Sequence, residues 1–232
     1  MVGGNPQRIP NIGVDMVLDK SRGRVDPLLT VIAKRFTNIN PDVLTWLALL
    51  FSIIAGGFFY LSNPLTELQN YFLFFAALFV LLNGLFDAID GKVAKLANKE
   101  TARGDFLDHA LDRYADVFII GALALSPWCR PPIGLLAIIG VLLTSYMGTQ
   151  AQAIGYKRDY SGLLGRADRL ALLIVFPVIQ HIALLFSLQL SWDLTILELV
   201  LVYFAVVGNI TAIQRFSITL RWFRGEFKKG KK

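Results

Sequence analysis

Cysteine and histidine are almost absent from this 232-residue chain, which contains one cysteine, Cys129, and two histidines. A single cysteine excludes an intramolecular disulfide framework and a thiolate metal site. Two histidines are also too few for the usual ligand sets of zinc. Any metal site in this protein is therefore expected to use oxygen ligands.

Charged residues are scarce as well, at 17% of the chain against 55% hydrophobic residues. The mean hydropathy is +0.55, and apolar stretches of about 20 residues, long enough to cross a bilayer, recur along the sequence. The first thirteen residues contain no apolar core, so no cleavable signal peptide is expected. The composition predicts an all-α polytopic membrane protein rather than one or two soluble domains.

Six transmembrane helices are expected, at about residues 41–61, 67–96, 103–125, 132–153, 167–186 and 194–216, the last with a polar extension to 223. They form a membrane domain over residues 37–223, preceded by a lead and juxtamembrane segment (1–36) and followed by a basic tail (224–232). In the first segment, Asp26 and Pro27 predict the N-cap and first position of a helix over 27–36. Its apolar residues share one face, which is typical of an amphipathic helix lying in the membrane interface.

Lys and Arg predict the orientation of these helices. They crowd both ends of the chain and the connections after the second and fourth spans, whereas the opposite side has only Arg130. By the positive-inside rule, both termini are expected in the cytoplasm of a multi-pass protein of the cell (plasma) membrane. The net charge of +6 thus indicates a membrane surface and no nucleic acid. Four aromatic residues fit an interfacial belt: Tyr60, Tyr71, Trp128 and Trp192.

Four aspartates recur at helical spacings beside the connection between the second and third spans. Asp87 and Asp90 are three residues apart, and Asp108 and Asp112 are four apart, so each pair shares one helix face. Acids at membrane depth are costly and indicate function. Clustered carboxylates repel one another unless hard cations such as Mg²⁺, Mn²⁺ or Ca²⁺ neutralise them. Two glycines beside the acids, at 91 and 104, leave backbone open to a phosphate or nucleotide.

The stretch from Asp87 to Asp112 reads Asp-x2-Asp-Gly-x2-Ala-Lys-x8-Gly-x3-Asp-x3-Asp. It resembles the signature of the CDP-alcohol phosphatidyltransferase family, from which it differs in one position, where Lys95 replaces the usual arginine. The resemblance implies transfer of a phosphatidyl or archaetidyl group from a CDP-linked lipid to the hydroxyl of a small polar acceptor, with release of CMP. It also implies membrane lipid as the surroundings, two bound Mg²⁺ or Mn²⁺ ions, and a homodimer.

Carried over residue by residue, the resemblance implies metal ligands at Asp87, Asp90, Asp108 and Asp112. Asp112 is also expected to act as the catalytic base, because it lies one turn beyond Asp108. The CDP site would include Thr45, Asn83, Gly91, Ala94, Lys95 and Gly104. Thr45 belongs to a Pro-Asp-x-x-Thr element like the family's Pro-Asn-x-x-Thr, with Asp42 in place of Asn. For Asn83, a helix–helix contact is as good an interpretation as a nucleotide contact.

Three arginines indicate an anionic acceptor: Arg166 and Arg169 at the start of the fifth span, and Arg215 in the sixth. The alternative is that they contact lipid headgroups. Family members that use inositol phosphate carry similar arginines, but they also carry a basic run late in the fourth span. Here that run reads Gly-Thr-Gln-Ala-Gln at 148–152. Inositol phosphate and glycerol phosphate both remain open as acceptors, with Gln150 as an acceptor contact or an interhelical hydrogen bond.

Two other functions are compatible with clustered acids. An intramembrane Mg²⁺-dependent prenyltransferase would use a motif like Asn83-x3-Asp87-x2-Asp90, but such proteins need a second acidic motif much farther along the chain. An ion transporter would spread its acids near the midplane of several spans. A further acid, Asp116, continues the spacing of Asp108 and Asp112 and is expected to pair with an arginine of the fifth span.

Overall fold

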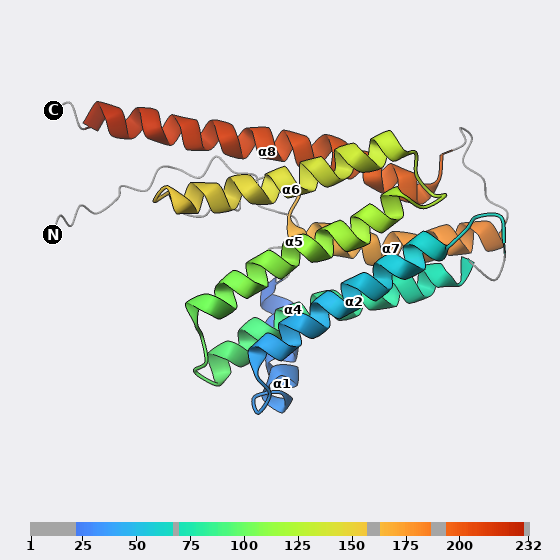
Figure 1. The fold of residues 1–232 in the computed structure, drawn as a ribbon, viewed down its shortest axis with the longest axis horizontal. Helices are drawn as coiled ribbons and strands as arrows, with labels where there is room; N and C mark the ends of the chain where they lie inside the picture. Colours follow the sequence, from blue (N-terminus) through green and yellow to red (C-terminus); the bar gives the residue numbers. More distant parts are fainter. Residues whose placement is uncertain (1–21, 67–69, 157–162, 187–193, 230–232) are drawn as a thin grey trace.

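The computed structural model describes residues 22–66, 70–156, 163–186 and 194–229, and within these ranges every regular element is a helix (Figure 1). The helices are α1 (Arg22–Arg35), α2 (Pro41–Leu61), α4 (Phe72–Leu96), α5 (Ala102–Ala124), α6 (Pro131–Ala153), α7 (Arg166–Leu185) and α8 (Ile196–Lys229). From α2 onward, successive helices run up and down one bundle, while α1 lies across it (Figure 1).

Five of these helices, α2, α4, α6, α7 and α8, are long and apolar enough to cross a membrane. They make the chain an integral multi-pass membrane protein of the all-α class. With 23 residues, α5 is as long as α6, but it carries several charged residues, among them Asp108, Asp112, Arg113 and Asp116. Its low hydropathy reflects those side chains, several of which face the other helices. That α5 also crosses the membrane, as the prediction of six spans requires, therefore stays a prediction.

Local sequence explains where the helices begin. The Asn40 side chain accepts a hydrogen bond from the Asp42 amide at 3.1 Å, and Pro41 occupies the first turn of α2. At the start of α5, Thr101 Oγ1 accepts a hydrogen bond from the Gly104 amide at 3.0 Å. Such caps satisfy amides that have no partner inside the helix. Apart from the end of the last helix, the predicted spans agree with the observed helices to within a few residues where both are described.

Three details of the sequence prediction are wrong. The first helix begins at Arg22, so Asp26 lies inside α1 rather than capping it, and its carboxylate binds Lys92 of α4 at 2.6 Å. Trp128 is not in an interfacial belt: it is 1% exposed and donates its indole N–H to Ser62 Oγ at 2.6 Å. The last helix continues beyond Phe223 to Lys229, into the predicted tail.

Some predictions concern residues outside the described ranges. These are the lead at 1–21, the predicted start of the second span at 67–69, the belt residue Trp192 and the last residues of the tail, 230–232.

The bundle has a main hydrophobic core and a smaller one. In the main core, buried side chains such as Phe59, Leu123 and Phe204 come from α2, α5 and α8. The smaller core consists of Ala33, Leu44, Ile89 and Val93, and it joins α1 to α2 and α4. It holds α1 against the end of α4 that carries the aspartates.

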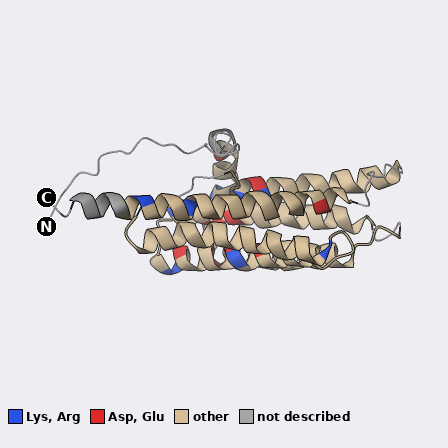
Figure 2. Cartoon of the chain, turned by 90° about the horizontal axis from the view of Figure 1, so that it is seen from above, with Lys and Arg blue, Asp and Glu red and all other residues tan. Residues whose placement is uncertain are grey.

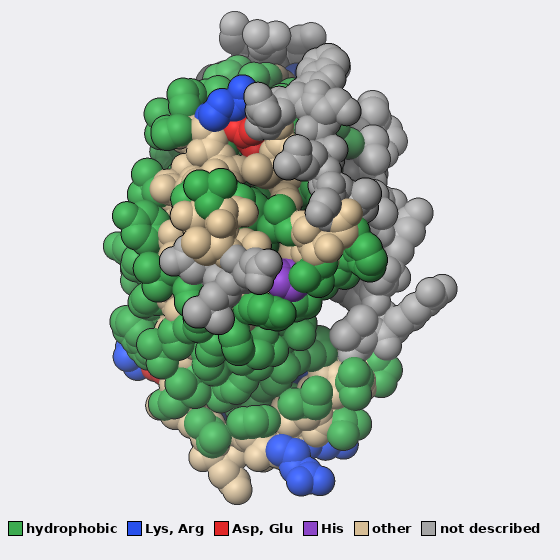
Figure 3. Space-filling model, turned by 90° about the vertical axis from the view of Figure 1, so that its right-hand side faces the viewer, with side chains coloured by type: hydrophobic (Ala, Val, Ile, Leu, Met, Phe, Trp, Pro, Cys, Tyr) green, Lys and Arg blue, Asp and Glu red, His purple; other side chains and the backbone are tan. Residues whose placement is uncertain are grey.

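Charge is distributed unevenly along the bundle. Figure 2 shows most of the coloured residues toward the end at which α8 finishes and few toward the other end. The described atoms at that other end are mainly hydrophobic (Figure 3). There, the buried Glu198 carboxylate binds Arg130 at 2.7 Å. Burial and the Glu198 charge raise the pKa of the nearby Cys129 thiol to about 11, so this thiol is protonated at neutral pH.

Helices α6 and α8 cross where two glycines meet. A Cβ added at Gly140 would lie 2.7 Å from Asn209 Nδ2 and 2.9 Å from the Asn209 amide nitrogen, and one added at Gly208 would lie 3.0 Å from the Gly140 carbonyl carbon. Thr144 Oγ1 also donates a hydrogen bond to the Gly208 carbonyl at 2.8 Å. Small residues that allow close backbone contact, together with interhelical hydrogen bonds, are typical of packing between membrane helices.

We therefore expect Gly140→Ala to lower the free energy of unfolding by about 1–3 kcal/mol, as overpacking of a tight contact usually does. Thermal unfolding of the purified protein in detergent measures this effect. Gly57→Ala is the matched control, because a Cβ there would meet no atom of the described chain within 4 Å. Equal melting temperatures for the two variants would show that the α6–α8 crossing tolerates a methyl group.

Candidate metal and phosphate site

Three aspartates meet where α4 ends and α5 begins. Carboxylate oxygens of Asp87, Asp90 and Asp108 all lie within 4.8 Å of one another. Asp90 is 4% exposed, and its Oδ2 atom has no hydrogen-bond partner among the described residues. A buried carboxylate oxygen without a donor, beside two further carboxylates, is a poor arrangement for the protein alone. It fits the oxygen ligands that Mg²⁺ and Mn²⁺ prefer.

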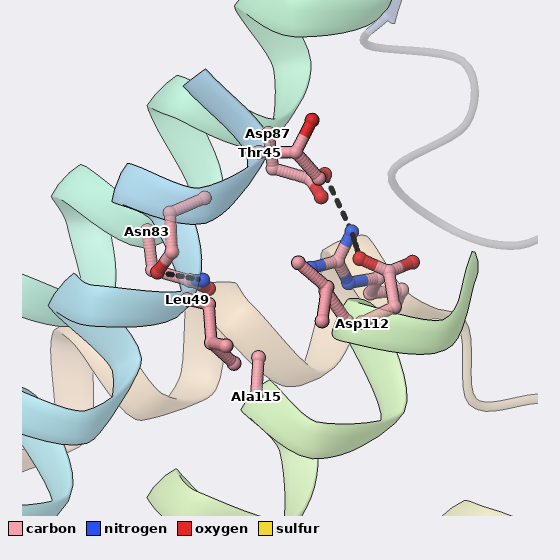
Figure 4. A pocket seen from close by; sticks show the side chains of 9 residues that line it. Thr45, Leu49, Asn83, Asp87, Asp112 and Ala115 are labelled. Carbon is pink, nitrogen blue, oxygen red and sulfur yellow. Dashed lines mark hydrogen bonds and ion pairs between the residues drawn. The ribbon is translucent and has the colours of Figure 1, made fainter. Parts of the chain in front are cut away.

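The fourth aspartate of the motif, Asp112, has a different partner. Its Oδ1 atom lies 2.6 Å from Nη1 of Arg166, and the same nitrogen lies 2.5 Å from Asp87 Oδ2 (Figure 4). Arg166, the first residue of α7, thus bridges α4 and α5. The structure gathers three of the predicted ligands into one cluster and places Asp112 beside it, so a ligand or base role for Asp112 stays a prediction.

Behind this bridge, charges of opposite sign alternate on α5 and α7. Arg169 binds Asp116 at 2.9 Å with both side chains buried, and Arg113 lies 3.1 Å from Asp116 and 3.4 Å from Asp112. The predicted pairing of Asp116 with an arginine of the fifth span is confirmed. Each charge in this network has a partner, which is how ionised groups persist inside a membrane protein.

A small pocket lies next to the Arg166 bridge (Figure 4). Thr45 and Asn83, both predicted to contact the nucleotide, line it together with Asp87 and Asp112. The Asn83 amide nitrogen donates a hydrogen bond to the Ala48 carbonyl at 2.9 Å. Its Oδ1 atom is buried and has no partner in the described parts of the chain. Asn83 therefore makes the helix–helix contact and still offers an acceptor.

The other predicted CDP residues lie outside the lining of this pocket. Gly91 is exposed, and a Cβ added there would meet nothing described within 4 Å, so its backbone is open to a ligand. Lys95 is exposed and Ala94 is partly buried, one turn farther along α4. Gly104 packs closely on its own helix cap, since a Cβ added there would lie 3.2 Å from Thr101 Oγ1.

The predicted acceptor residues are spread over a longer distance. Arg166 lies at the acids and Arg169 at Asp116, while Arg215 donates a hydrogen bond from Nη1 to the Thr144 carbonyl at 2.7 Å. Gln150 is exposed on α6. Only Arg166 is thus in direct contact with the carboxylates of the predicted metal site.

Sequence reasoning missed two contacts around the cluster. His109 lies 3.4 Å from Asp108 and from Asp105, which precedes it by one turn of helix. The spacing of Asp105 and His109 was an available signal. Arg103 binds Asp42 at 2.7 Å and joins the start of α5 to the start of α2, a contact for which the sequence offers no signal.

Comparisons with known proteins agree with this architecture. The archaetidylinositol phosphate synthase of Pyrococcus horikoshii is 28% identical over 161 residues, which cover 68% of this chain and 81% of the relative. The phosphatidylinositol phosphate synthase of Cutibacterium acnes is 26% identical, covering 77% of this chain and 84% of that protein. A crystal structure of the phosphatidylinositol phosphate synthase of Mycobacterium tuberculosis with CDP-DAG bound superimposes with a TM-score of 0.64 at 25% identity, covering 83% of this chain and 94% of that one.

The family model for CDP-alcohol phosphatidyltransferase matches residues 38–213, well over half of the chain, and includes every aspartate of the cluster. This match leaves no support for the prenyltransferase and transporter alternatives. The chain belongs to the CDP-alcohol phosphatidyltransferase family.

Proposed function

We propose that this chain transfers the lipid phosphate group of a CDP-linked lipid to a hydroxyl of inositol phosphate and releases CMP. The transferase class and the phosphorylated polyol acceptor follow from the family and from relatives that are synthases of inositol-phosphate lipids. The observation that carries the proposal is the cluster of Asp87, Asp90 and Asp108, with the guanidinium of Arg166 directly beside it.

The residues of the site divide the chemistry between them. Asp87, Asp90 and Asp108 would hold Mg²⁺ or Mn²⁺, with a second ion reaching Asp112. A bound divalent cation supplies charge stabilisation for the oxygens of the diphosphate as CMP leaves. Asp112 takes the proton of the attacking hydroxyl as general base. Thr45 and Asn83 offer hydrogen-bonding groups to the nucleotide from the pocket wall.

The arginines supply the specificity for an anionic acceptor. A phosphate monoester is best bound by guanidinium groups, which donate paired hydrogen bonds. Arg166, Arg169 and Arg215 would provide them. The relatives favour inositol phosphate. A second candidate, glycerol phosphate, is favoured by the uncharged run at 148–152, where Gln150 replaces a basic side chain.

The surroundings of the site are part of the proposal. The crowding of Lys and Arg at one end of the bundle supports a site and both termini on the cytoplasmic side of the cell membrane. A homodimer is proposed from the family resemblance. The Gly-rich pair at 56–57 gives it little support, because a Cβ added at Gly56 would lie 2.5 Å from the Phe118 carbonyl oxygen of α5, so Gly56 packs inside the bundle.

The test is CMP release by the purified protein with a CDP-linked lipid and Mg²⁺ or Mn²⁺, given one acceptor at a time. The acceptors are inositol phosphate, glycerol phosphate, free inositol, serine and none. Release with inositol phosphate alone supports the proposal. Release with glycerol phosphate alone selects the second candidate, and release with free inositol or serine would contradict the role given to the arginines.

Arg215→Gln tests the acceptor site separately from the CDP site. We expect the KM for the phosphorylated acceptor to rise about tenfold or more, because a hydrogen bond to a charged group is worth about 1.5–3 kcal/mol. The KM for the CDP-linked lipid should change little. Arg221→Gln, which removes an exposed arginine of the same helix, is the control. Equal increases in both KM values would show that Arg215 does not act on the acceptor.

A further inference from the structure

Arg166 binds two of the carboxylates that are predicted to hold a metal ion. Its Nη1 atom is a cationic donor placed between one carboxylate oxygen of Asp87 and one of Asp112, at 2.5 and 2.6 Å (Figure 4). Asp87 is at the same time a member of the cluster formed with Asp90 and Asp108. The guanidinium therefore neutralises, within the protein, a carboxylate that a divalent cation would otherwise neutralise.

The guanidinium and a divalent cation cannot share this carboxylate without cost. Both are positive, they would lie within a few ångströms of each other, and charges repel more strongly among partly buried side chains than in bulk water. The cation would also withdraw electron density from the Asp87 oxygens that accept the hydrogen bond of Arg166. Binding of the cation is thus expected to weaken the contact of Arg166 with Asp87.

The bonding of Arg166 is incomplete in its present position. A guanidinium has five N–H donors, and the contacts of Arg166 to carboxylates both use Nη1. Its Nε atom is buried and has no partner among the residues that the structure describes. A partly buried cation with an unused, buried donor fits a second position with another anion, in which more of its donors are satisfied.

We propose that Arg166 is an internal competitor of the metal ion. In the metal-free protein it holds Asp87 and Asp112 together; when the cation binds, Arg166 leaves Asp87 and presents its guanidinium to a phosphate group at the site. The identity of that phosphate rests on the proposed function, whereas the competition does not. By linkage, the cation and the phosphate then raise each other's affinity by the same factor.

The test is the affinity for Mn²⁺ of the purified protein, measured by electron paramagnetic resonance of the free ion in the absence of substrate. Arg166→Gln is expected to bind Mn²⁺ about tenfold more tightly than the unchanged protein, because the competing hydrogen bonds are worth about a factor of ten or more. Without Mn²⁺, this variant should also melt at a lower temperature than the unchanged protein. Addition of Mn²⁺ should raise its melting temperature by more.

Arg103→Gln is the matched control. It removes the same charge near the start of α5, but Arg103 binds Asp42 rather than the cluster, so its affinity for Mn²⁺ should stay within about twofold of that of the unchanged protein. Equal tightening in both variants would overturn the proposal in favour of a general effect of charge. Unchanged or weaker binding in Arg166→Gln would overturn it as well. If Arg166→Gln does not fold, Arg166→Lys takes its place. It should still bind Mn²⁺ more tightly, because one ammonium cannot match the planar donor geometry of arginine, but the gain in affinity should be smaller, because the positive charge is kept.

Two further binding measurements identify the phosphate group that Arg166 contacts. Binding of labelled inositol phosphate and of CMP is measured with and without Mn²⁺ in the unchanged protein and in Arg166→Gln. A Mn²⁺-dependent gain in ligand affinity that disappears in the variant supports the proposal. It assigns the phosphate to the acceptor if inositol phosphate shows the gain, and to the nucleotide if CMP shows it. A gain that persists in the variant for both ligands would overturn it. Absence of any Mn²⁺ binding by the unchanged protein would contradict the metal site of the proposed function itself.

Discussion

Asp90→Asn is expected to slow CMP release about 10²–10³-fold, because single groups that stabilise charge in a transition state are each worth 10²–10³ in rate. Asp90 is the most buried member of the cluster with Asp87 and Asp108, and its Oδ2 atom lacks a partner in the described chain. An amide in its place presents at most one oxygen and no charge. The rate of CMP release with saturating lipid, acceptor and Mn²⁺ measures the effect.

The same substitution should leave the protein folded. Asn has nearly the size of Asp, and the change removes a buried charge that lies beside two other carboxylates. We therefore expect a melting temperature, without metal, that is equal to or above that of the unchanged protein, together with loss of the increase caused by Mn²⁺. Glu100→Gln, at an exposed position between α4 and α5, serves as the control and should keep its activity. Activity retained in Asp90→Asn would exclude Asp90 as a ligand.

Helical periodicity explains why the cluster could be predicted from the sequence. Asp87 and Asp90 share a face of α4, Asp108 lies in the first turns of α5, and a short connection brings the two helix ends together. The pairing of Asp116 with Arg169 was predictable for a similar reason, since a buried acid in an apolar helix needs a cationic partner. These contacts depend on spacing within one helix and on the need to neutralise charge.

The contacts of Arg166 could not be predicted in this way. They depend on how α7 packs against both α4 and α5, and no sequence spacing determines the distance from one residue to acids on two other helices. The prediction for Trp128 was wrong for a related reason. Its position near a helix end is typical of an interfacial aromatic, but packing buries it and supplies Ser62 as the acceptor of its N–H. Asp26 likewise prefers a helix cap by itself, whereas the ion pair with Lys92 stabilises it inside α1.

Helix α5 shows the limit of hydropathy as a signal. Composition alone does not class it with the five apolar helices, because it carries charged side chains that form ion pairs with α7. The sequence nevertheless predicts a span at about 103–125 among the recurring apolar stretches, and the structure has a helix there, Ala102–Ala124.

Arg169→Ala is expected to lower the free energy of unfolding by about 3 kcal/mol, toward the lower end of the 3–5 kcal/mol cost of breaking a buried ion pair. The loss leaves Asp116, which is 7% exposed, without its partner at 2.9 Å. Arg113 lies 3.1 Å from the same carboxylate and compensates in part. Unfolding in detergent measures the effect. A variant as stable as the unchanged protein would show that the pair contributes nothing.

The double variant Arg169→Ala with Asp116→Asn separates stability from acceptor binding. Replacing Asp116 by Asn removes the buried charge that Arg169→Ala leaves unpaired, so we expect the double variant to regain most of the lost stability, as non-additivity between contacting residues predicts. If Arg169 also binds the acceptor phosphate, the KM for the acceptor stays high in the double variant although the fold is restored. If Arg169 serves only to neutralise Asp116, stability and KM recover together. The cycle thus distinguishes a guanidinium that holds the helices from one that holds the substrate, which the ion pair by itself does not decide.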